Sequence, residues 1–242
     1  MNPLKLLHIS DLHHGKFNTI GRRTTRIAMI NARYPNHAKI ATGDITDNGT
    51  EYASIAGMQG WFVVPGNHDM EAWGIFFPKR KKARAFDAQF YTRFAQEQLP
   101  YILPDYDHEV VVLGLNSNPL AWQLYINFAR GNIGVRQRRH LARLLQAYAG
   151  WTRVVCLHHH PFTRNPWMAL ADSKKLMTLL TGNCEVLLFG HKHAQELYTI
   201  GTAGRRFGIP VTHAAGALYA ETHALELTIE NGKVTTQYVE IV

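Results

Sequence analysis

Short apolar runs recur along the chain, and each one ends in a polar or glycine-containing stretch. Runs of about four to eight residues that are rich in valine, isoleucine and leucine are typical of buried β-strands. The sequence therefore predicts strands in PLKLLHIS, HAKIAT, WFVV, EVVVLGL, TRVVCL and CEVLLF.

Segments with helical spacing lie between these predicted strands. In residues 136–149, apolar side chains recur at i, i+3, i+4 and i+7, with arginine and glutamine on the opposite face. Residues 86–99 place three phenylalanines and a leucine on roughly one stripe. Residues 172–182 begin with a capping residue, Asp172, and end at Gly182. Each of these segments is predicted to be a helix.

The C-terminal residues 224–242 alternate apolar and polar positions around Asn231-Gly232, the strongest short signal for a β-hairpin. Strands that alternate with helices and close on such a hairpin predict an α/β or α+β layered domain with two sheets, and we expect the α/β form, a two-sheet sandwich flanked by helices. The 242 residues fit a single domain, 1–242. Residues 71–109 are the least strand-like part and are predicted to form a helical cap inserted near the functional site.

Composition narrows the class of protein. Hydrophobic residues make up 46% of the chain and charged residues 18%, which suits a large core and argues against long disordered segments. Cys156 and Cys184 lie in apolar runs without a C-x-x-C spacing, so we expect buried thiols in a reducing cytoplasm. No apolar run is long enough to span a membrane, and the N-terminus lacks the pattern of a signal peptide.

Polar residues collect where the predicted strands end. They form five groups: Asp11 and His13; Asp44; Asn67 and His68; His158, His159 and His160; and His191 and His193. Loops at the carboxyl ends of strands in an α/β sheet converge on one crevice, so we expect these groups to meet. Oxygen and imidazole ligands without thiolates suit Mn²⁺, Fe or Zn²⁺. Their number suits two metal ions that share a bridge.

The spacing within the groups supports a shared site. Asp11 and His13, like His191 and His193, are i, i+2 pairs, whose side chains point to the same side of an extended chain. Asp44 follows Gly43, where the backbone can turn sharply, and its two carboxylate oxygens could bridge two cations.

The five groups follow the order D-x-H, G-D-x-x-D, G-N-H-D, a histidine before proline, and G-H-x-H, between residues 11 and 193. In this the chain resembles the calcineurin-like metallophosphoesterases, and most of all the small bacterial phosphodiesterases that act on cyclic nucleotides or glycerophosphodiesters. The resemblance implies a binuclear metal centre. Its ligands would be Asp11, His13 and His193 for one ion, Asn67, His159 and His191 for the other, and Asp44 as the bridge.

The resemblance also implies a mechanism. Two metal ions, with Mn²⁺ as the first choice and Fe or Zn²⁺ as alternatives, would activate a hydroxide that attacks the phosphorus atom. His68 would not bind metal but would protonate the leaving-group oxygen, because an imidazole with an ordinary pKa near 6.5 can do so close to neutral pH. Asp47 and Asp69 match outer acidic positions that orient ligands.

The triplet in VVCLHHHPF requires a choice among three histidines. If the strand continues through them, His159 faces away from both neighbours. The family's H-x-P spacing selects His159 as the metal ligand. His158 would then close the strand, and His160 would contact substrate.

Several functions of one superfamily remain open at this point. The net charge of +8 favours an anionic partner, and we expect a small phosphoester, a diester rather than a monoester, with nucleic acid less favoured. The basic run at 79–84 is expected to be a solvated face, with an anionic-substrate or nucleic-acid contact as the alternative. Further alternatives are a nuclease, a phosphomonoesterase or pyrophosphatase, and a non-catalytic interaction scaffold.

Overall fold

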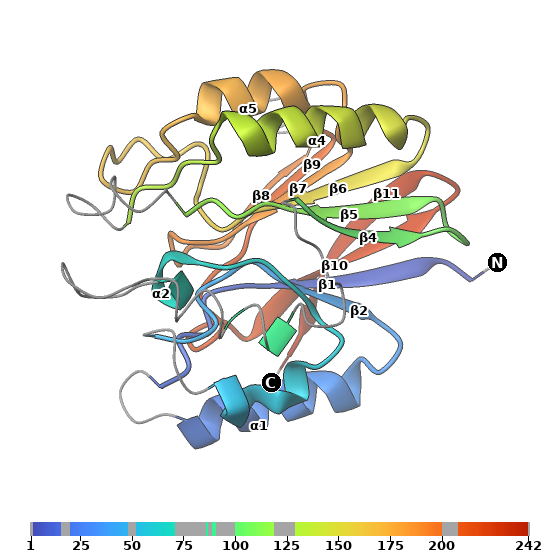
Figure 1. Ribbon diagram of the computed structural model, residues 1–242. Coiled ribbons are helices and arrows are strands. Elements are labelled where there is room, and N and C mark those ends of the chain that lie inside the picture. Colours follow the sequence, from blue (N-terminus) through green and yellow to red (C-terminus); the bar gives the residue numbers. More distant parts are fainter. Residues whose placement is uncertain are drawn as a thin grey trace.

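Two mixed β-sheets pack face to face and carry helices on their outer faces (Figure 1). The computed structural model describes residues 2–15, 20–47, 52–70, 86, 89–90, 100–118, 129–199 and 208–241. This is the predicted α/β architecture, with a sandwich of two sheets.

The first sheet has the strand order β11-β10-β1-β2-β3. Its central strand β1 (Leu4–Ile9) pairs in parallel with β2 (Ala38–Ala41), which pairs in parallel with β3 (Phe62–Val63). On the other side of β1 lies the antiparallel hairpin of β10 (His223–Glu230) and β11 (Lys233–Glu240). Asn231 and Gly232 both have positive φ, as a two-residue hairpin turn requires, so the predicted hairpin is confirmed.

The second sheet has the strand order β4-β5-β6-β7-β9-β8. Four parallel strands form its centre, and an antiparallel strand closes each edge. The central strands are β5 (Val110–Gly114), β6 (Thr152–Cys156), β7 (Val186–Phe189) and β9 (Val211–Ala214), and the edges are β4 (Tyr101–Asp105) and β8 (Glu196–Thr199).

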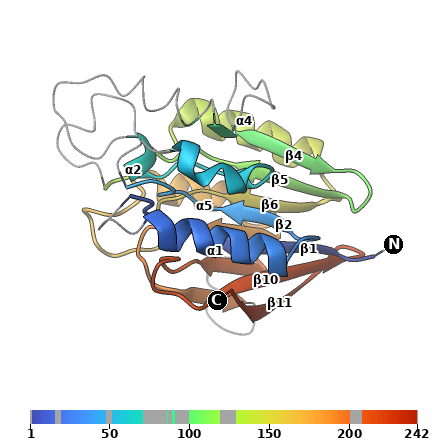
Figure 2. The ribbon, with the colours of Figure 1, turned by 90° about the horizontal axis from the view of Figure 1, so that it is seen from below.

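Alternation along the strands divides the core into two layers. Val110 and Val112 of β5 belong to the core between the sheets, whereas Val111 and Leu113 pack with the helices on the outer face. Those helices are α4 (Val135–Ala147) and α5 (Ser173–Leu180), which agree with two of the predicted segments. Figure 2 shows α1 (Ile20–Arg33) along the first sheet, and the 3₁₀ segment η2 (Tyr52–Met58) contacts α1.

The prediction of a helical cap over 71–109 is wrong at its C-terminal end, because Tyr101–Asp105 forms strand β4. Pro104 obscured this strand in the sequence, yet β4 is an edge strand, where proline is tolerated.

Within the remainder of the predicted cap, Phe86 and Phe90 are buried with ring centroids 4.9 Å apart. Most of the predicted cap lies outside the described residues, as does the basic run at 79–84.

Asp172 precedes α5 as predicted, but its carboxylate serves the other helix. It accepts hydrogen bonds from the backbone N–H groups of Ile133 (3.0 Å) and Gly134 (2.9 Å) at the start of α4, and it pairs with Arg138. The capping prediction was therefore wrong in its target, since the side chain makes no cap hydrogen bond to α5.

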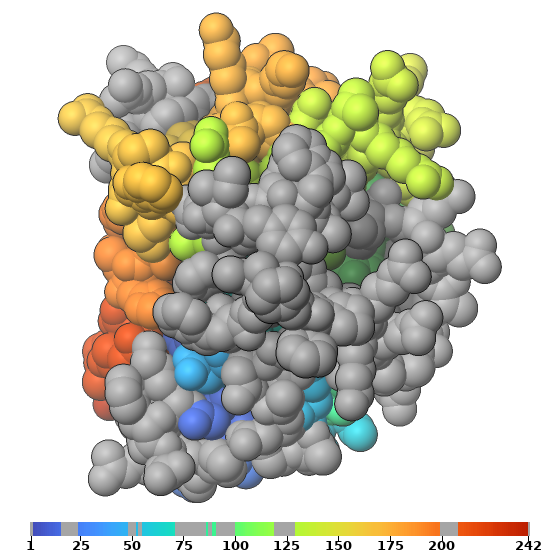
Figure 3. All heavy atoms as spheres, turned by 60° about the vertical axis from the view of Figure 1, so that its left-hand side comes forward, coloured from blue at the N-terminus to red at the C-terminus, as the bar shows by residue number. Residues whose placement is uncertain are grey.

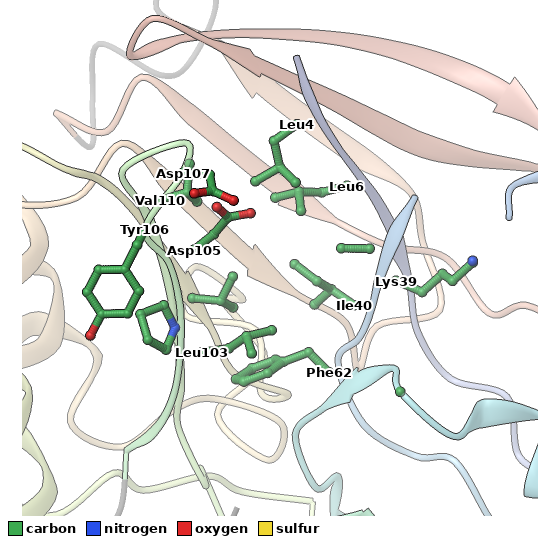
Figure 4. Close-up of a pocket in the computed structure, with 14 residues that line it drawn as sticks. Leu4, Leu6, Lys39, Ile40, Phe62, Leu103, Asp105, Tyr106, Asp107 and Val110 are labelled. Atoms are coloured by element: carbon green, nitrogen blue, oxygen red, sulfur yellow. The ribbon is translucent and has the colours of Figure 1, made fainter. Parts of the chain in front are cut away.

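A cavity of about 490 Å³ opens between the sheets at the ends of β1 and β5 where these strands begin. Leu4 and Leu6 line it from the first sheet, and Leu103 and Val110 from the second, with Asp105 and Asp107 at one side (Figure 4). The polar groups predicted to meet lie at the opposite ends of the strands. Among the described residues, no helix has the length and apolar character needed to cross a membrane.

Candidate metal centre

The predicted groups gather beyond the carboxyl ends of β1, β2, β3, β6 and β7. The loops are bonded to one another there: the Asp11 N–H donates to the Gly43 carbonyl (3.0 Å), and the His13 N–H donates to the Asp44 carbonyl (2.8 Å). The Gly190 N–H donates to the His158 carbonyl at 3.0 Å. Figure 3 views this side of the molecule, where segments near the N-terminus and segments that follow β6 and β7 reach one face.

Backbone strain is concentrated in these loops. Seven non-glycine residues among those described have positive φ, and five of them belong to the predicted site: Asp11, His13, Asp44, His191 and His193. Such conformations are costly for ordinary residues and cluster at functional sites. The i, i+2 pairs therefore converge through left-handed turns, and the extended geometry expected from the sequence is wrong.

Two glycines allow the loops to approach closely. Gly43 has φ +93°, and a Cβ there would lie 2.6 Å from His158 Nδ1 and 2.7 Å from the Gly66 nitrogen. A Cβ on Gly66 would collide with the Asp44 carboxylate. These contacts explain physically why glycine precedes Asp44 and Asn67 in the sequence.

One cluster of possible metal ligands consists of Asp11, His13, Asp44 and His193. The Nε2 atoms of His13 and His193 lie 3.0 Å apart, and His193 Nε2 lies 3.3 Å from Asp11 Oδ1. Asp11 Oδ1 is buried and accepts no hydrogen bond from the described residues. Carboxylate and imidazole atoms that converge in this way fit a shared cation.

A second cluster consists of Asp44, His158 and His191. His158 Nε2 lies 3.0 Å from His191 Nδ1 and 3.4 Å from Asp44 Oδ2. Asn67 joins this cluster, because its Oδ1 lies 3.0 Å from His158 Nε2. Asp44 belongs to both of these clusters, which is the geometry expected of a bridging carboxylate, and a third group of possible ligands consists of His13, Asp47 and His68.

The histidine triplet differs from the prediction, since His158 rather than His159 lies beside Asp44. Val154 and Cys156 of β6 belong to the core between the sheets, and alternation continued by two residues turns His158 to that same side. His159 Nδ1 instead lies 2.7 Å from Ser117 Oγ. The sequence did not reveal which face of β6 was inward, and the choice of His159 by its spacing to Pro161 stays a prediction beside this observed position of His158.

His159 also adjoins the second cluster, because its ring centroid lies 4.6 Å from that of His191 and its buried Nε2 has no hydrogen-bond partner among the described residues. Burial, then the charges of His191 and His158, lowers the pKa of His159 well below its usual range. His160 is buried as well, and its Nε2 lies 3.3 Å from Glu196 Oε2. His14 is also buried, and its backbone pairs with that of Thr46.

Each clustered histidine uses its second ring nitrogen to contact another group. His13 Nδ1 lies 3.1 Å from Asp47 Oδ1, His158 Nδ1 lies 2.7 Å from the Thr42 carbonyl, and His193 Nδ1 lies 3.3 Å from the Tyr219 hydroxyl. Such contacts fix the orientation of a histidine ligand. The sequence indicated Asp47 alone, because a backbone carbonyl carries no side-chain signal and Tyr219 follows no strand-end motif.

The Asp69 carboxylate binds backbone N–H groups, whereas Asp47 contacts a histidine ring. Its carboxylate accepts hydrogen bonds from the N–H groups of Ile45 (3.1 Å), Thr46 (2.9 Å) and Gly66 (2.9 Å). Burial, together with the charge of Asp44, raises the pKa of Asp69 to about 6. Asp69 thus joins the loop that carries Asp44 to the loop that carries Asn67.

The buried Asp44 carboxylate and the His158 imidazole shift each other's pKa. Burial alone would raise the pKa of Asp44, but the charge and hydrogen bond of His158 lower that pKa well below its usual range. Burial alone would lower the pKa of His158, whereas the Asp44 charge raises it to about 9. Burial and the charge of His158 lower the pKa of His191 to about 3. Asp44 therefore carries a negative charge among imidazoles.

His68 lies beside the clusters. Its backbone N–H donates to Asp44 Oδ1 at 2.9 Å, and its Nδ1 lies 2.8 Å from the Asp47 carbonyl oxygen. The His68 and His13 rings meet edge to face at 4.7 Å. The His68 side chain is 22% exposed, whereas that of His13 is 1% exposed, so His68 can meet a ligand that arrives from solvent.

Comparison with protein families shows which family the chain belongs to. The model for the calcineurin-like phosphoesterases matches residues 4–195, which is most of the chain. The chain belongs to the calcineurin-like phosphoesterase family. It is thus a metal-dependent phosphoester hydrolase by family, and the resemblance noted from its motifs is confirmed. No curated protein matches the chain.

Several solved structures share the fold at low sequence identity. GAP50 of Plasmodium, the anchor in the inner membrane complex, has a TM-score of 0.62 and 10% identity, with coverage of 100% of this chain and 85% of that one. YfkN of Bacillus subtilis, a calcineurin-like phosphoesterase, has a TM-score of 0.55 and 14% identity, with coverage of 99% of this chain and 91% of that one. A phosphatase of Mycoplasma pneumoniae has a TM-score of 0.54 and 13% identity, with coverage of 99% of this chain and 93% of that one.

Proposed function

We propose that the protein hydrolyses small phosphodiesters at a centre that holds two divalent metal ions. The observation that carries this proposal is the position of Asp44, which lies in both clusters of candidate ligands. In this assignment Asp11, His13 and His193 hold one ion, Asn67, His158 and His191 hold the other, and Asp44 holds both. In this proposal His158 takes the position that the sequence analysis assigned to His159.

Two bound cations would offset the charge of the phosphate and lower the pKa of an attacking water. The residues of the chain do the rest. Asp47 and the Thr42 carbonyl fix the rings of His13 and His158, so that the opposite nitrogens face the clusters. His68, partly exposed and beside His13, is placed to protonate the departing oxygen.

The donor set favours Mn²⁺ as the physiological ion, with Fe or Zn²⁺ as alternatives. Its side chains supply carboxylate and amide oxygens and imidazole nitrogens, and both free cysteines are buried away from it. The two unpaired thiols also support a reducing compartment such as the cytoplasm. We also treat the chain as a single domain, because one buried core combines residues from both sheets.

A diester is favoured over a monoester by charge. A monoester carries more negative charge and needs additional cations beside the metal ions. Lys192 lies between the clustered His191 and His193 in the sequence, yet its Nζ pairs with Glu196 Oε1 at 2.7 Å. Glu196 thereby offsets the nearest lysine of this loop.

The net charge of +8 supports a nucleic acid substrate as the second candidate. A panel decides between them: metal-free protein is reloaded with Mn²⁺ and tested on glycerophosphodiesters, cyclic nucleotides, p-nitrophenyl phosphate and single-stranded DNA. Turnover of small diesters, lost in Asp44→Asn, is the expected result. Turnover of monoesters alone would overturn the proposal, and preference for DNA would establish the nuclease.

A further inference from the structure

Tyr219 lies at the rim of the candidate metal centre, in the segment between β9 and β10. The residue is 40% exposed although it is large and aromatic. Its hydroxyl lies 3.3 Å from His193 Nδ1, and its ring meets the rings of His193 and His13 edge to face at 6.0 and 6.1 Å. Tyr219 also lies beyond residues 4–195, so the family model does not cover it.

The backbone around Tyr219 is held firmly. The Leu218 N–H donates to the Ser10 carbonyl at 3.1 Å, one residue before Asp11. Arg26 of α1 donates to the carbonyls of Leu218 and Glu221, on either side of the tyrosine. Tyr219 is therefore presented by an ordered segment fastened to the loop that carries Asp11.

The two nitrogens of the His13 ring divide the rim into two sides. Nδ1 points to Asp47, whose carbonyl oxygen contacts His68. Nε2 points to His193, whose own Nδ1 contacts Tyr219. Ring nitrogens of an imidazole point in diverging directions, so His68 and Tyr219 flank different edges of His13.

The most exposed side chains of the centre lie on these two sides of His13. The side chains of His193, Asp47 and His68 are 35%, 32% and 22% exposed. By contrast, Asp11, Asp44 and His158 are almost fully buried. Among the described residues of the centre, a phosphoester coming from solvent thus meets His68 on one side and His193 with Tyr219 on the other.

We infer that Tyr219 is a substrate-contacting residue that selects phosphodiesters with a flat aromatic substituent, such as a nucleobase, on the group that stays on phosphorus. The inference rests on the proposed function, in which His68 serves the leaving oxygen. The leaving group then lies on the His68 side and the retained group lies on the Tyr219 side. An exposed tyrosine ring offers that retained group a stacking surface.

Two substrates with one leaving group isolate this contact. Bis(p-nitrophenyl) phosphate and methyl p-nitrophenyl phosphate both release p-nitrophenolate, but they retain an aromatic ring and a methyl group, respectively. Tyr219→Leu should reduce kcat/KM for the aromatic diester by about tenfold, mainly through KM, and leave the methyl ester nearly unchanged. Tyr219→Phe, which keeps the ring, should preserve the wild-type preference.

A matched control is Tyr106→Leu. Tyr106 is 72% exposed and packs on Trp151 at the opposite end of the strands, so its replacement should leave both substrates unaffected. Equal losses on the two esters in Tyr219→Leu, or an unchanged preference, would overturn the inference. A wild type that turns over neither ester would instead contradict the proposed function.

A binding measurement keeps the inference testable in that case. Phenylphosphonate should bind the Mn²⁺-loaded wild type about tenfold more tightly than methylphosphonate in calorimetry, and Tyr219→Leu should remove the difference. Equal affinity of the two phosphonates for the wild type would overturn the role of Tyr219 without bearing on phosphoester hydrolysis.

Discussion

His158 Nδ1 lies 2.7 Å from the carbonyl oxygen of Thr42, and this contact determines which nitrogen of His158 faces the candidate metal centre. A carbonyl can only accept a hydrogen bond, so Nδ1 carries the proton and donates it. Nε2 is thereby turned toward Asp44 and Asn67. A backbone group one residue after β2 thus positions a side chain that follows β6.

The first prediction separates the adjacent histidines. His158→Ala should lose one equivalent of bound Mn²⁺ and at least about a hundredfold in turnover, because a ligand is lost. His159→Ala should keep both, and should lower the free energy of unfolding, because it removes a buried ring that contacts Ser117. Metal analysis, steady-state rates and urea unfolding of both variants provide the measurements. Loss of metal in His159→Ala alone would contradict the structural assignment.

The contrast between these two residues illustrates what the sequence could and could not predict. The motifs brought together five groups at strand ends, because strand carboxyl ends converge whatever the details of the fold. The choice within the triplet depended on which face of β6 turns inward, and that is settled by packing with the other sheet. The positive φ values of Asp11 and His193 likewise arise from loop closure and leave no sequence pattern.

Secondary structure was predictable in the centre of the sheets and not at their edges. β5 and β7 are buried along their whole length, β6 is buried except at Arg153, and each of the three strands contains an apolar run. β4 contains Pro104 and β8 contains Glu196, and both strands close an edge where one side needs no hydrogen-bonding partner. Their sequences therefore lack the strand signal.

The second prediction concerns His68 and the leaving group. His68→Gln should slow diesters with alkoxide leaving groups by about a hundredfold or more, since these oxygens need a proton as they depart. Esters of p-nitrophenol should be affected far less, because p-nitrophenolate is a stable anion. Rates for glycerophosphodiesters and bis(p-nitrophenyl) phosphate provide the comparison. Equal losses on both would show that His68 does not act as the acid.

The third prediction concerns stability in mild acid. Burial lowers the pKa of His213 to about 3 from an ordinary value of 6.5. Between these values the unfolded chain binds a proton that the folded chain excludes, so the free energy of unfolding decreases as the pH falls. The contribution reaches at most about 1.4 kcal/mol per pH unit.

His213→Gln tests this contribution. Urea unfolding of the metal-free variant at about pH 7, 6 and 5 should show a shallower dependence on pH than the wild type. His223→Gln is the control, because His223 is exposed at the start of β10. An identical slope in His213→Gln and wild type would show that His213 does not contribute.

The fourth prediction concerns the link between α4 and α5. Asp172→Ala removes the acceptor of the Ile133 and Gly134 N–H groups and the partner of Arg138, which should cost about 1–2 kcal/mol in the free energy of unfolding. Turnover should remain unchanged, because these groups lie on the outer face of the second sheet. Asp172→Asn should recover part of the loss, since one oxygen still accepts. A reduced metal content in Asp172→Ala would contradict this separation.

The most direct test of the central claim is a Mn²⁺ titration of the metal-free protein, followed by turnover of bis(p-nitrophenyl) phosphate at each step. The wild type should bind two equivalents, and its turnover should rise as the second is bound. Asp44→Asn should fail to retain the pair of ions and lose turnover, because Asp44 lies in both clusters. Full turnover without metal, or wild-type turnover in Asp44→Asn, would contradict the account.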